Sequence, residues 1–405
     1  MRLMNCLKTV MLTVLVGCTL WSCSEEKGKA RYVPVVLDGE EKWSILDTKT
    51  GDILCENDFD EMPSMVEDEM FVVRTKAGYY QCYKVDDSKN VVSKGKFTQL
   101  GTFGHEGVTF AVKEGKGIII VDKNFEEVKK LPQDVTQTIS FSDGLAAFCK
   151  DGKWGFLDKK GEVAIPAKFD QVASFEDGRA LAMKGEKILI INKKGETVKS
   201  FNSDKYSPMQ YTYHNGLIAM TKGNDRVIFI DKDGEEKFTS NKMEVGSTCY
   251  KVDDNKTVFY KDGGFGIIST DGEVLVRPKY KALQFASKDR YIAMNDDGKC
   301  GIIDSKGEKI LDFEYDSMAQ VSTDHSRYFA LDGSTWILIN EKGEELTKDS
   351  YKSVNFDVDN LQGFYSEAAS ADSFMTEPAA DYDSVEVEPD EYDDYYESVD
   401  SAAAY

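Results

Sequence analysis

One pattern recurs nine times in this chain: an apolar strand, a turn with glycine and a second apolar strand, followed in five of the copies by Asp or Asn with Gly three residues later. The clearest copy is residues 145–175, LAAFCKDGKWGFLDKKGEVAIPAKFDQVASF. The copies align on the glycine of the first turn: Gly39, Gly78, Gly115, Gly152, Gly185, Gly223, Gly263, Gly298 and Gly333. Repeats of this size predict an array of supersecondary units, each of which buries its faces against its neighbours.

The residues within each copy predict hairpins. The first strand carries a small residue in most copies: Ala111, Ala147, Ala182, Ala219, Ala293 and Ala330. Asp-Gly follows it at 38–39, 151–152, 262–263 and 297–298, and this pair is a strong hairpin signal because a primed turn needs positive φ. The second strand is a nearly continuous apolar run, which is typical of a strand covered on both faces. The Asp-x-x-Gly segment after it predicts a type I turn capped by the Asp side chain.

Most copies then continue with two shorter strands marked by an aromatic residue: Phe59, Phe97, Phe169, Tyr206, Tyr280, Tyr315 and Tyr351. Four short strands in one repeat make up a propeller blade. We therefore predict an all-β, propeller-like ring of about seven to nine units. Residues 31–38 would supply a first strand and residues 336–356 the last ones, which suits ring closure. An open β-solenoid of hairpins is the alternative.

Residues 151–158, DGKWGFLD, resemble the WG-repeat (or KWG-repeat) family of bacterial proteins. Other copies keep one letter of the motif: Phe265-Gly266 and Cys300-Gly301 keep the glycine, and Trp43 and Trp336 keep the tryptophan. The resemblance covers roughly residues 31–356, the predicted repeat domain. It implies a β-repeat scaffold, commonly secreted or lipid-anchored, with no activity that can be carried over.

The first residues predict a targeting segment, residues 1–22, with Arg2 and Lys8 before an apolar run too short to span a membrane. The segment Leu20-Trp21-Ser22-Cys23, followed by polar residues, resembles a bacterial lipoprotein signal in which the cysteine is acylated. We predict acylation at Cys23, with Cys18 as the alternative, and a linker over residues 23–30. The lipid would hold the protein on the outer membrane or cell surface. A position on the periplasmic face and secretion are the alternatives.

The C-terminal segment differs in composition from the repeats. Residues 353–405 contain no Lys or Arg and 15 Asp and Glu. Such a segment cannot bury enough apolar surface to fold, so residues 357–405 are predicted to form a disordered acidic tail. It would serve either as a partner-capturing arm or as a soluble linker. The net charge of −22 also argues against nucleic acid as a partner.

Residues that could perform chemistry are scattered. His105, His214 and His325 lie in different copies, and none has the spacing of a metal site or a catalytic triad. Five cysteines follow the signal without any C-x-x-C pair, and we expect them to be small buried side chains: Cys55, Cys82, Cys149, Cys249 and Cys300. The Asp of Asp-x-x-Gly recurs, which indicates a role in the turn. We therefore predict no catalytic residue, metal site or cofactor, and give little weight to Asp231-Lys232-Asp233-Gly234 as a Ca²⁺ loop.

Binding residues are expected where a copy departs from the pattern. The candidates are tyrosines of two such segments: Tyr79, Tyr80, Tyr206, Tyr211 and Tyr213. The recurring Trp43, Trp154, Trp336 and Phe265 are instead expected to form a packing layer, with sugar or peptide platforms as the alternative. The sequence thus favours a non-catalytic scaffold that binds an unidentified protein, peptide or glycan. The alternative is a carbohydrate-active hydrolase with a carboxylate pair on one face of the ring.

Overall fold

The computed structural model describes residues 31–355, except for 114, 210, 212, 214–215, 224–225, 241–251, 288 and 322–325. All described residues belong to one compact unit within Met1–Phe364, and the predicted targeting segment, linker and acidic tail lie outside the described residues. Apart from one short 3-10 helix, η1 (Gly104–Glu106), the regular structure of the described residues consists of β-strands. No helix in this part of the chain is long and apolar enough to cross a membrane.

The strands fall into nine consecutive repeats. The first three repeats contain β1 (Tyr32–Leu37), β2 (Trp43–Asp47) and β3 (Ile53–Phe59); β4 (Met70–Arg74) and β5 (Tyr80–Lys84); and β6 (Phe97–Leu100), β7 (Val108–Lys113), β8 (Gly117–Asp122) and β9 (Glu127–Lys130). The next three contain β10 (Val135–Thr138), β11 (Leu145–Lys150), β12 (Lys153–Asp158) and β13 (Val163–Phe169); β14 (Gln171–Val172), β15 (Arg179–Lys184), β16 (Lys187–Asn192) and β17 (Thr197–Asn202); and β18 (Tyr206–Pro208), β19 (Leu217–Lys222), β20 (Arg226–Asp231) and β21 (Glu236–Ser240).

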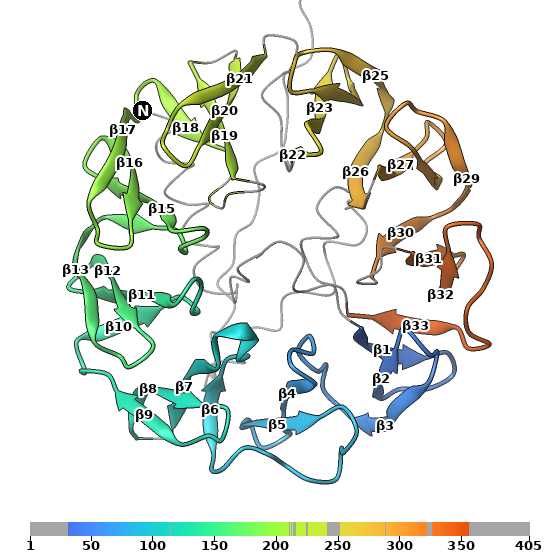
Figure 1. The fold of residues 1–405 in the computed structure, drawn as a ribbon. Helices are drawn as coiled ribbons and strands as arrows, with labels where there is room; N and C mark the ends of the chain where they lie inside the picture. Colours follow the sequence, from blue (N-terminus) through green and yellow to red (C-terminus); the bar gives the residue numbers. More distant parts are fainter. Residues whose placement is uncertain are drawn as a thin grey trace, which may run out of the picture. The chain divides into compact units, whose positions relative to one another are not determined.

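The last three repeats contain β22 (Val252–Asp253), β23 (Lys256–Lys261), β24 (Gly264–Ser269) and β25 (Val274–Tyr280); β26 (Ala282–Ser287), β27 (Arg290–Met294), β28 (Cys300–Ile303) and β29 (Lys309–Tyr315); and β30 (Ser317–Gln320), β31 (Arg327–Asp332), β32 (Thr335–Asn340) and β33 (Tyr351–Val354). Repeats four to eight each form a separate four-stranded antiparallel sheet, with the strands in chain order. In repeats seven and eight the first strands, β22 and β26, lie nearest the middle of the ring, and β25 and β29 lie at its rim (Figure 1).

The two ends of the described chain meet in one sheet, whose order is β3-β2-β1-β33-β32-β31-β30. Within it, β33 pairs with β1 through Val35↔Val354 and Val36↔Ser353, and Tyr351 also pairs with Trp336 of β32. The last strand therefore supplies the first strand of repeat one. This pairing closes the predicted propeller-like ring, and the open solenoid is excluded because its ends would stay apart.

The ring has two faces that differ in their turns. On one, which we call the turn face, lie the Asp-x-x-Gly turns between third and fourth strands. On the other, the hairpin face, lie the glycine turns between second and third strands. Asp151 and Gly152 both have positive φ (51° and 71°), as the hairpin prediction requires. At 297–298 the predicted turn differs: Gly298 has φ 78°, but Asp297 does not have a positive φ. This turn is longer and is closed by a hydrogen bond from Gly298 N to Asn295 O (3.1 Å).

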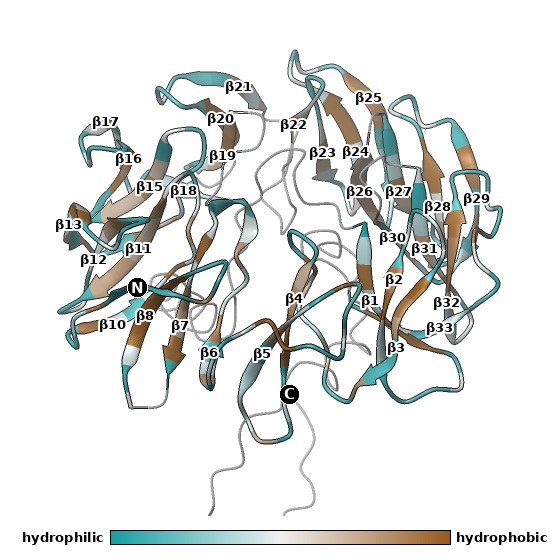
Figure 2. Cartoon of the chain, turned by 60° about the horizontal axis from the view of Figure 1, so that its bottom comes forward, coloured by the Kyte–Doolittle hydropathy of each residue, from teal (hydrophilic) through white to brown (hydrophobic). Residues whose placement is uncertain are grey.

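Apolar side chains fill the spaces between neighbouring sheets. The cluster of Phe156, Phe175 and Ile191, for example, joins repeats four and five, and each of these residues is fully buried. The six alanines expected at one position are buried: Ala111, Ala147, Ala182, Ala219, Ala293 and Ala330. Small side chains there let adjacent sheets approach closely. In Figure 2 the hydrophobic colour lies mainly on the strands and the hydrophilic colour on the turns.

The glycine of the motif lies opposite a bulge in the fourth strand. In repeat four, Trp154 pairs with Phe169 and Phe156 with Ile165, so β13 has two more residues over this stretch than β12. A Cβ on Gly155 would lie 2.5 Å from Ile165 O and 2.6 Å from Ala167 N. Gly266 and Gly301 face similar bulges with similarly close backbone atoms. Only a residue without a side chain fits against this backbone.

Copies without the glycine solve the same packing problem in other ways. In repeat five, Ile188 pairs with Phe201 and Ile190 with Lys199, so β17 has no bulge there and Leu189 fits at the glycine position. In repeat one the position is Ser44, whose Oγ accepts a hydrogen bond from Asn57 N (2.8 Å). Its partner strand β3 takes positive φ at Cys55 and Asn57 (49° and 50°). The glycine therefore follows the shape of the fourth strand.

Candidate functional surface

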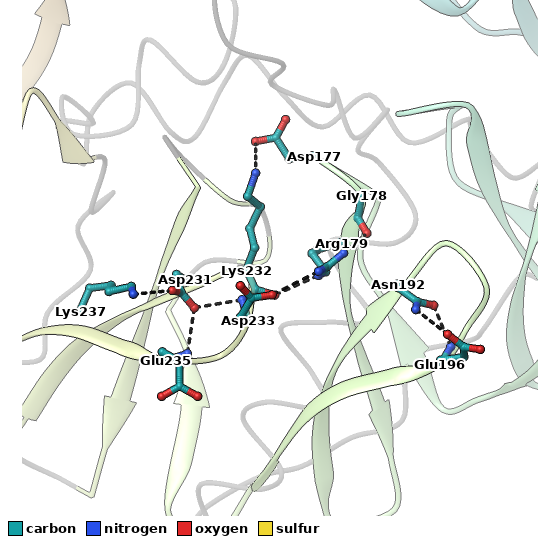
Figure 3. Close-up of polar contacts among 10 residues, drawn as sticks. All are labelled: Asp177, Gly178, Arg179, Asn192, Glu196, Asp231, Lys232, Asp233, Glu235 and Lys237. Carbon is teal, nitrogen blue, oxygen red and sulfur yellow. Dashed lines mark hydrogen bonds and ion pairs between the residues drawn. The ribbon is translucent and has the colours of Figure 1, made fainter.

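The recurring carboxylates of the turn face cap their own turns. Asp231 Oδ1 accepts hydrogen bonds from Asp233 N and Glu235 N (2.9 Å each), and Oδ2 pairs with Lys237 (2.8 Å), as Figure 3 shows. These bonds hold the pKa of Asp231 below its usual value although burial acts to raise it. Both carboxylate oxygens are thus engaged in the turn and with the following strand. Within the described residues, no group of three His, Cys, Asp or Glu side chains could hold a metal ion.

Charged side chains on the turn face also join each repeat to the next. Lys232 pairs with Asp177 of the preceding repeat (3.3 Å), and Arg179 Nε donates to Lys232 O (3.0 Å) (Figure 3). The same positions recur one repeat earlier, where Asp143 accepts from Lys193 Nζ (2.5 Å) and from Gly178 N (2.6 Å). Because these contacts recur from repeat to repeat, we assign them to ring assembly.

The hairpin face has a matching set of contacts. Asp170 accepts hydrogen bonds from Lys153 Nζ of its own repeat and from Gly185 N of the next (2.6 Å). The lysine contact and the backbone bond lower the pKa of Asp170. Asp316 repeats the arrangement with Lys299 (2.5 Å) and Gly333 N (3.2 Å). The Asp after the aromatic residue thus connects adjacent hairpins.

The aromatic and cysteine positions in the repeat belong mainly to the core. Trp154 is 6% exposed and packs in the cluster between repeats four and five, as expected for a packing layer. The other residues at this position are half-buried and also contact core clusters: Trp43, Trp336 and Phe265. Cys82, Cys149 and Cys300 are buried as predicted, whereas Cys55 is half-buried. Burial raises the pKa of Cys82 and Cys300 to about 12, so both are thiols at neutral pH. Cys249, His214 and His325 lie outside the described residues.

The five candidate tyrosines do not form one site. Tyr79 and Tyr80 belong to repeat two and the other three to repeat six, and β5 and β18 lie on opposite sides of the ring (Figure 1). The Tyr206 ring packs against that of Phe201 in a tilted arrangement, with ring centroids 5.1 Å apart, and Tyr211 is 40% exposed. The two segments predicted from the sequence thus lie four repeats apart in the ring.

Tyr213 is a core residue. It is 2% exposed and belongs to the cluster between repeats five and six. Its place before the second strand matches that of Phe103, Phe141 and Phe175, which are all buried. Its hydroxyl has no hydrogen-bond partner among the residues that the structure describes. Since a buried ring cannot meet a ligand, we remove Tyr213 from the candidate surface.

Repeat two departs most from the common sheet. It has only β4 and β5, and β5 meets β6 through the single pair Tyr80↔Phe97. Residues 85–96 replace the regular fourth strand, and Ser93 Oγ accepts a hydrogen bond from Cys82 N (3.1 Å). At the hairpin face the Lys96 ammonium lies 4.9 Å from the centre of the Tyr79 ring. We call Tyr79, Tyr80 and Lys96 the Tyr79 surface.

A shallow apolar hollow of about 220 Å³, open to solvent, lies between repeats five and six. Its lining comes from β14, β15, the start of β16 and the segment containing Tyr211: Gln171, Val172, Ala173, Leu181, Ala182, Met183, Ile188, Pro208 and Tyr211. None of these residues is ionisable apart from Tyr211. The hollow therefore offers no carboxylate pair for glycoside hydrolysis.

Comparison with known families identifies the repeat. The family described as WG containing repeat matches residues 137–154, 154–187, 265–300 and 301–322. The chain carries WG repeats. The matched segments contain Gly155, Gly266 and Gly301, the three glycines that lie opposite bulges. Repeats one, two, three and six lie outside the matched segments.

Solved structures resemble the WG-repeat ring in fold. A crystal structure of a eukaryotic initiation factor shares 9% identity, covers 81% of this chain and 98% of its own, and gives a TM-score of 0.57. BamB from Moraxella catarrhalis shares 11% identity over 65% of this chain and 93% of its own, with a TM-score of 0.37. Hsv2p of Kluyveromyces lactis shares 10% over 71% and 96%, with a TM-score of 0.37. At these identities the first likeness concerns the fold alone, and no curated protein sequence matches the chain.

Proposed function

We propose that this protein is an envelope lipoprotein whose WG-repeat ring binds a protein, peptide or glycan without catalysing a reaction. One observation carries this proposal. The residues that the repeats share are engaged in turns, in contacts between repeats and in the core. Repeat two instead places an aromatic ring, Tyr79, directly after its turn glycine, where the other copies have no aromatic residue, and the Lys96 ammonium lies beside this ring. Rigid repeat scaffolds commonly bind through such departures from the consensus.

The chemistry of the Tyr79 surface suits this role. A tyrosine ring offers a flat apolar face for sugar or peptide groups, and its hydroxyl can form hydrogen bonds. Tyr80 packs against the core cluster of repeat three, which fixes the adjacent backbone. The Thr75 hydroxyl donates to Tyr79 O (2.9 Å) and so holds the turn in place. A ligand would meet a preorganised surface and lose little entropy in ordering it.

Binding can be tested with the mature chain on arrays of bacterial surface polysaccharides and immobilised peptides. We expect Tyr79→Ala to weaken the strongest interaction at least tenfold. Tyr260→Ala is the matched control, because Tyr260 is a partly buried tyrosine in a different repeat that is not among the candidate residues. Equal binding by wild type and Tyr79→Ala would exclude the Tyr79 surface. Turnover of a bound glycan would overturn the non-catalytic role.

Membrane attachment is a separate part of the proposal. Acylation of Cys23 would add several buried methylene groups per chain, each worth about 0.8 kcal/mol of membrane affinity. We expect Cys23→Ala to stop incorporation of labelled palmitate and to release the protein from the membrane fraction. Cys18→Ala should leave both unchanged. The opposite pattern would assign the lipid to Cys18, and labelling of neither cysteine would refute lipidation.

A further inference from the structure

The described chain enters and leaves the ring at the same face. Strand β1 starts at Tyr32, and Thr48 N in the turn between β2 and β3 donates to Arg31 O (2.8 Å), which places Arg31 at the turn face. Strand β33 runs antiparallel to β1, and Asn355 N donates to Pro34 O (2.9 Å) beyond its last pair. The chain therefore enters repeat one at the turn face, and its last described strand runs toward that same face.

The turn face of one repeat lies on the same side of the ring as that of the next. On this side Lys193 pairs with Asp143, Lys159 with Glu106 (2.6 Å), and Arg327 Nη2 donates to Lys49 O (3.3 Å) across the closure. On the other side Asp60 pairs with Lys76 (3.1 Å) and lies 4.0 Å from Lys42, which joins the first two hairpins. The two faces are thus continuous surfaces, and a chain end at the turn face defines one side of the whole ring.

From this geometry we propose that the ring lies with its turn face toward the membrane and its hairpin face away from it. The inference rests on the proposed acylation of Cys23. Eight peptide units separate Cys23 from Arg31. They span at most ~28 Å when fully extended, and a flexible chain of this length has a root-mean-square span of about 16 Å.

The height of the ring decides between the two faces. The six residues of β1 rise about 20 Å from the turn face toward the hairpin face. To place the hairpin face on the membrane, the linker would have to run back along the whole sheet in a nearly extended form. With the turn face on the membrane, the usual span of the linker is sufficient. The difference in chain entropy favours the second orientation.

This orientation has a consequence for binding. The Tyr79 surface lies at the hairpin end of repeat two, so it would face away from the lipid. Tyr206 lies at the same face, since it pairs with Lys222 at the hairpin end of β19. A soluble macromolecule could reach these rings without displacing the protein from the membrane.

Energy transfer from single dyes to acceptor lipids tests the orientation. The acylated full-length protein, with Cys55 and Cys249 replaced by Ala, is reconstituted in vesicles of phosphatidylethanolamine and phosphatidylglycerol. Dyes are placed through Glu186→Cys or Lys194→Cys in repeat five, and through Asp297→Cys or Lys306→Cys in repeat eight. All four side chains are exposed, and β16 and β29 lie on opposite sides of the ring (Figure 1). Because each repeat carries one position on each face, comparing the two repeats corrects for a tilt of the ring relative to the membrane.

We expect transfer from Lys194→Cys and Lys306→Cys to be at least twofold higher than from Glu186→Cys and Asp297→Cys. Equal transfer from the two faces would indicate an edge-on ring and overturn the proposal, as would higher transfer from the hairpin positions. Flotation of the same vesicles separates this failure from failure of the anchor. If the protein does not float with the lipid, and Cys23→Ala behaves identically, the proposed lipoprotein function is wrong.

Discussion

Replacing Gly155 by Ala should destabilise the ring more than the change of one methyl group suggests. The added Cβ would meet Ile165 O at 2.5 Å, Ala167 N at 2.6 Å and Pro166 C at 2.8 Å. All three are backbone atoms of the bulge in β13, so no side-chain rotation relieves the contact. Overpacking of a well-packed site costs about 1–3 kcal/mol, and we expect a loss near the top of that range, ~3 kcal/mol.

Urea unfolding of the mature, non-lipidated chain, followed by fluorescence and circular dichroism, measures this loss. Gly152→Ala is the matched control, because its Cβ would meet nothing within 4 Å and only its φ of +71° opposes a side chain. A left-handed residue costs about 1 kcal/mol. If Gly155→Ala loses no more stability than Gly152→Ala, the explanation of the motif glycine is wrong.

A compensating variant makes the test sharper. Deleting Pro166 and Ala167 removes the two extra residues of β13 and gives the regular pairing of β16 with β17. In that background Gly155→Ala should lower the free energy of unfolding by less than about 0.5 kcal/mol, because the bulge that the new Cβ would contact is gone. An unchanged cost in the deletion background would show that the bulge is not the reason for the glycine.

Two further changes test the assignments of individual residues. Tyr213→Phe removes a buried hydroxyl without a hydrogen-bond partner, so the free energy of unfolding in urea should stay constant or rise by about 1 kcal/mol; a loss above that size would indicate an undetected partner. Asp170 has a lowered pKa in the folded ring, so it stabilises the fold above the unfolded pKa of about 4 and loses this effect as pH falls through the folded pKa. Because its side chain is 37% exposed, Asp170→Asn should lower the free energy of unfolding by under about 1 kcal/mol at pH 7, and by less as the pH falls through the folded pKa. A cost that grows in acid would contradict this assignment.

The repeat predicted the architecture because its signals are local. Asp151-Gly152 and the apolar run after Lys153 specify a hairpin without reference to the rest of the chain. Ring closure was also foreseen, since residues 31–38 and 336–356 carry complementary parts of one sheet. The bulge opposite Gly155 was not, because it depends on the length of the fourth strand relative to the third, which no single residue reveals.

The candidate site was less predictable. Tyr79 and Tyr213 look alike in the sequence as tyrosines that break the pattern. In the structure Tyr79 lies beside Lys96 at the hairpin face, and Tyr213 fills the core position taken by Phe175 one repeat earlier. A comparison of Tyr213 with Phe103, Phe141 and Phe175 was the available signal for its burial. The cation near Tyr79 comes from an irregular segment 17 residues later, and nothing in the pattern indicates that contact.

A disulfide between β1 and β33 tests the closed ring most directly. Val36 and Ser353 are paired residues of these strands, and cysteines at paired positions of antiparallel strands lie within disulfide range. In the double variant Val36→Cys and Ser353→Cys, made without Cys55 and Cys249, we predict a bond within one chain that raises resistance to urea. Failure to form this bond under oxidising conditions, or bonds only between chains, would contradict the ring and favour an open array.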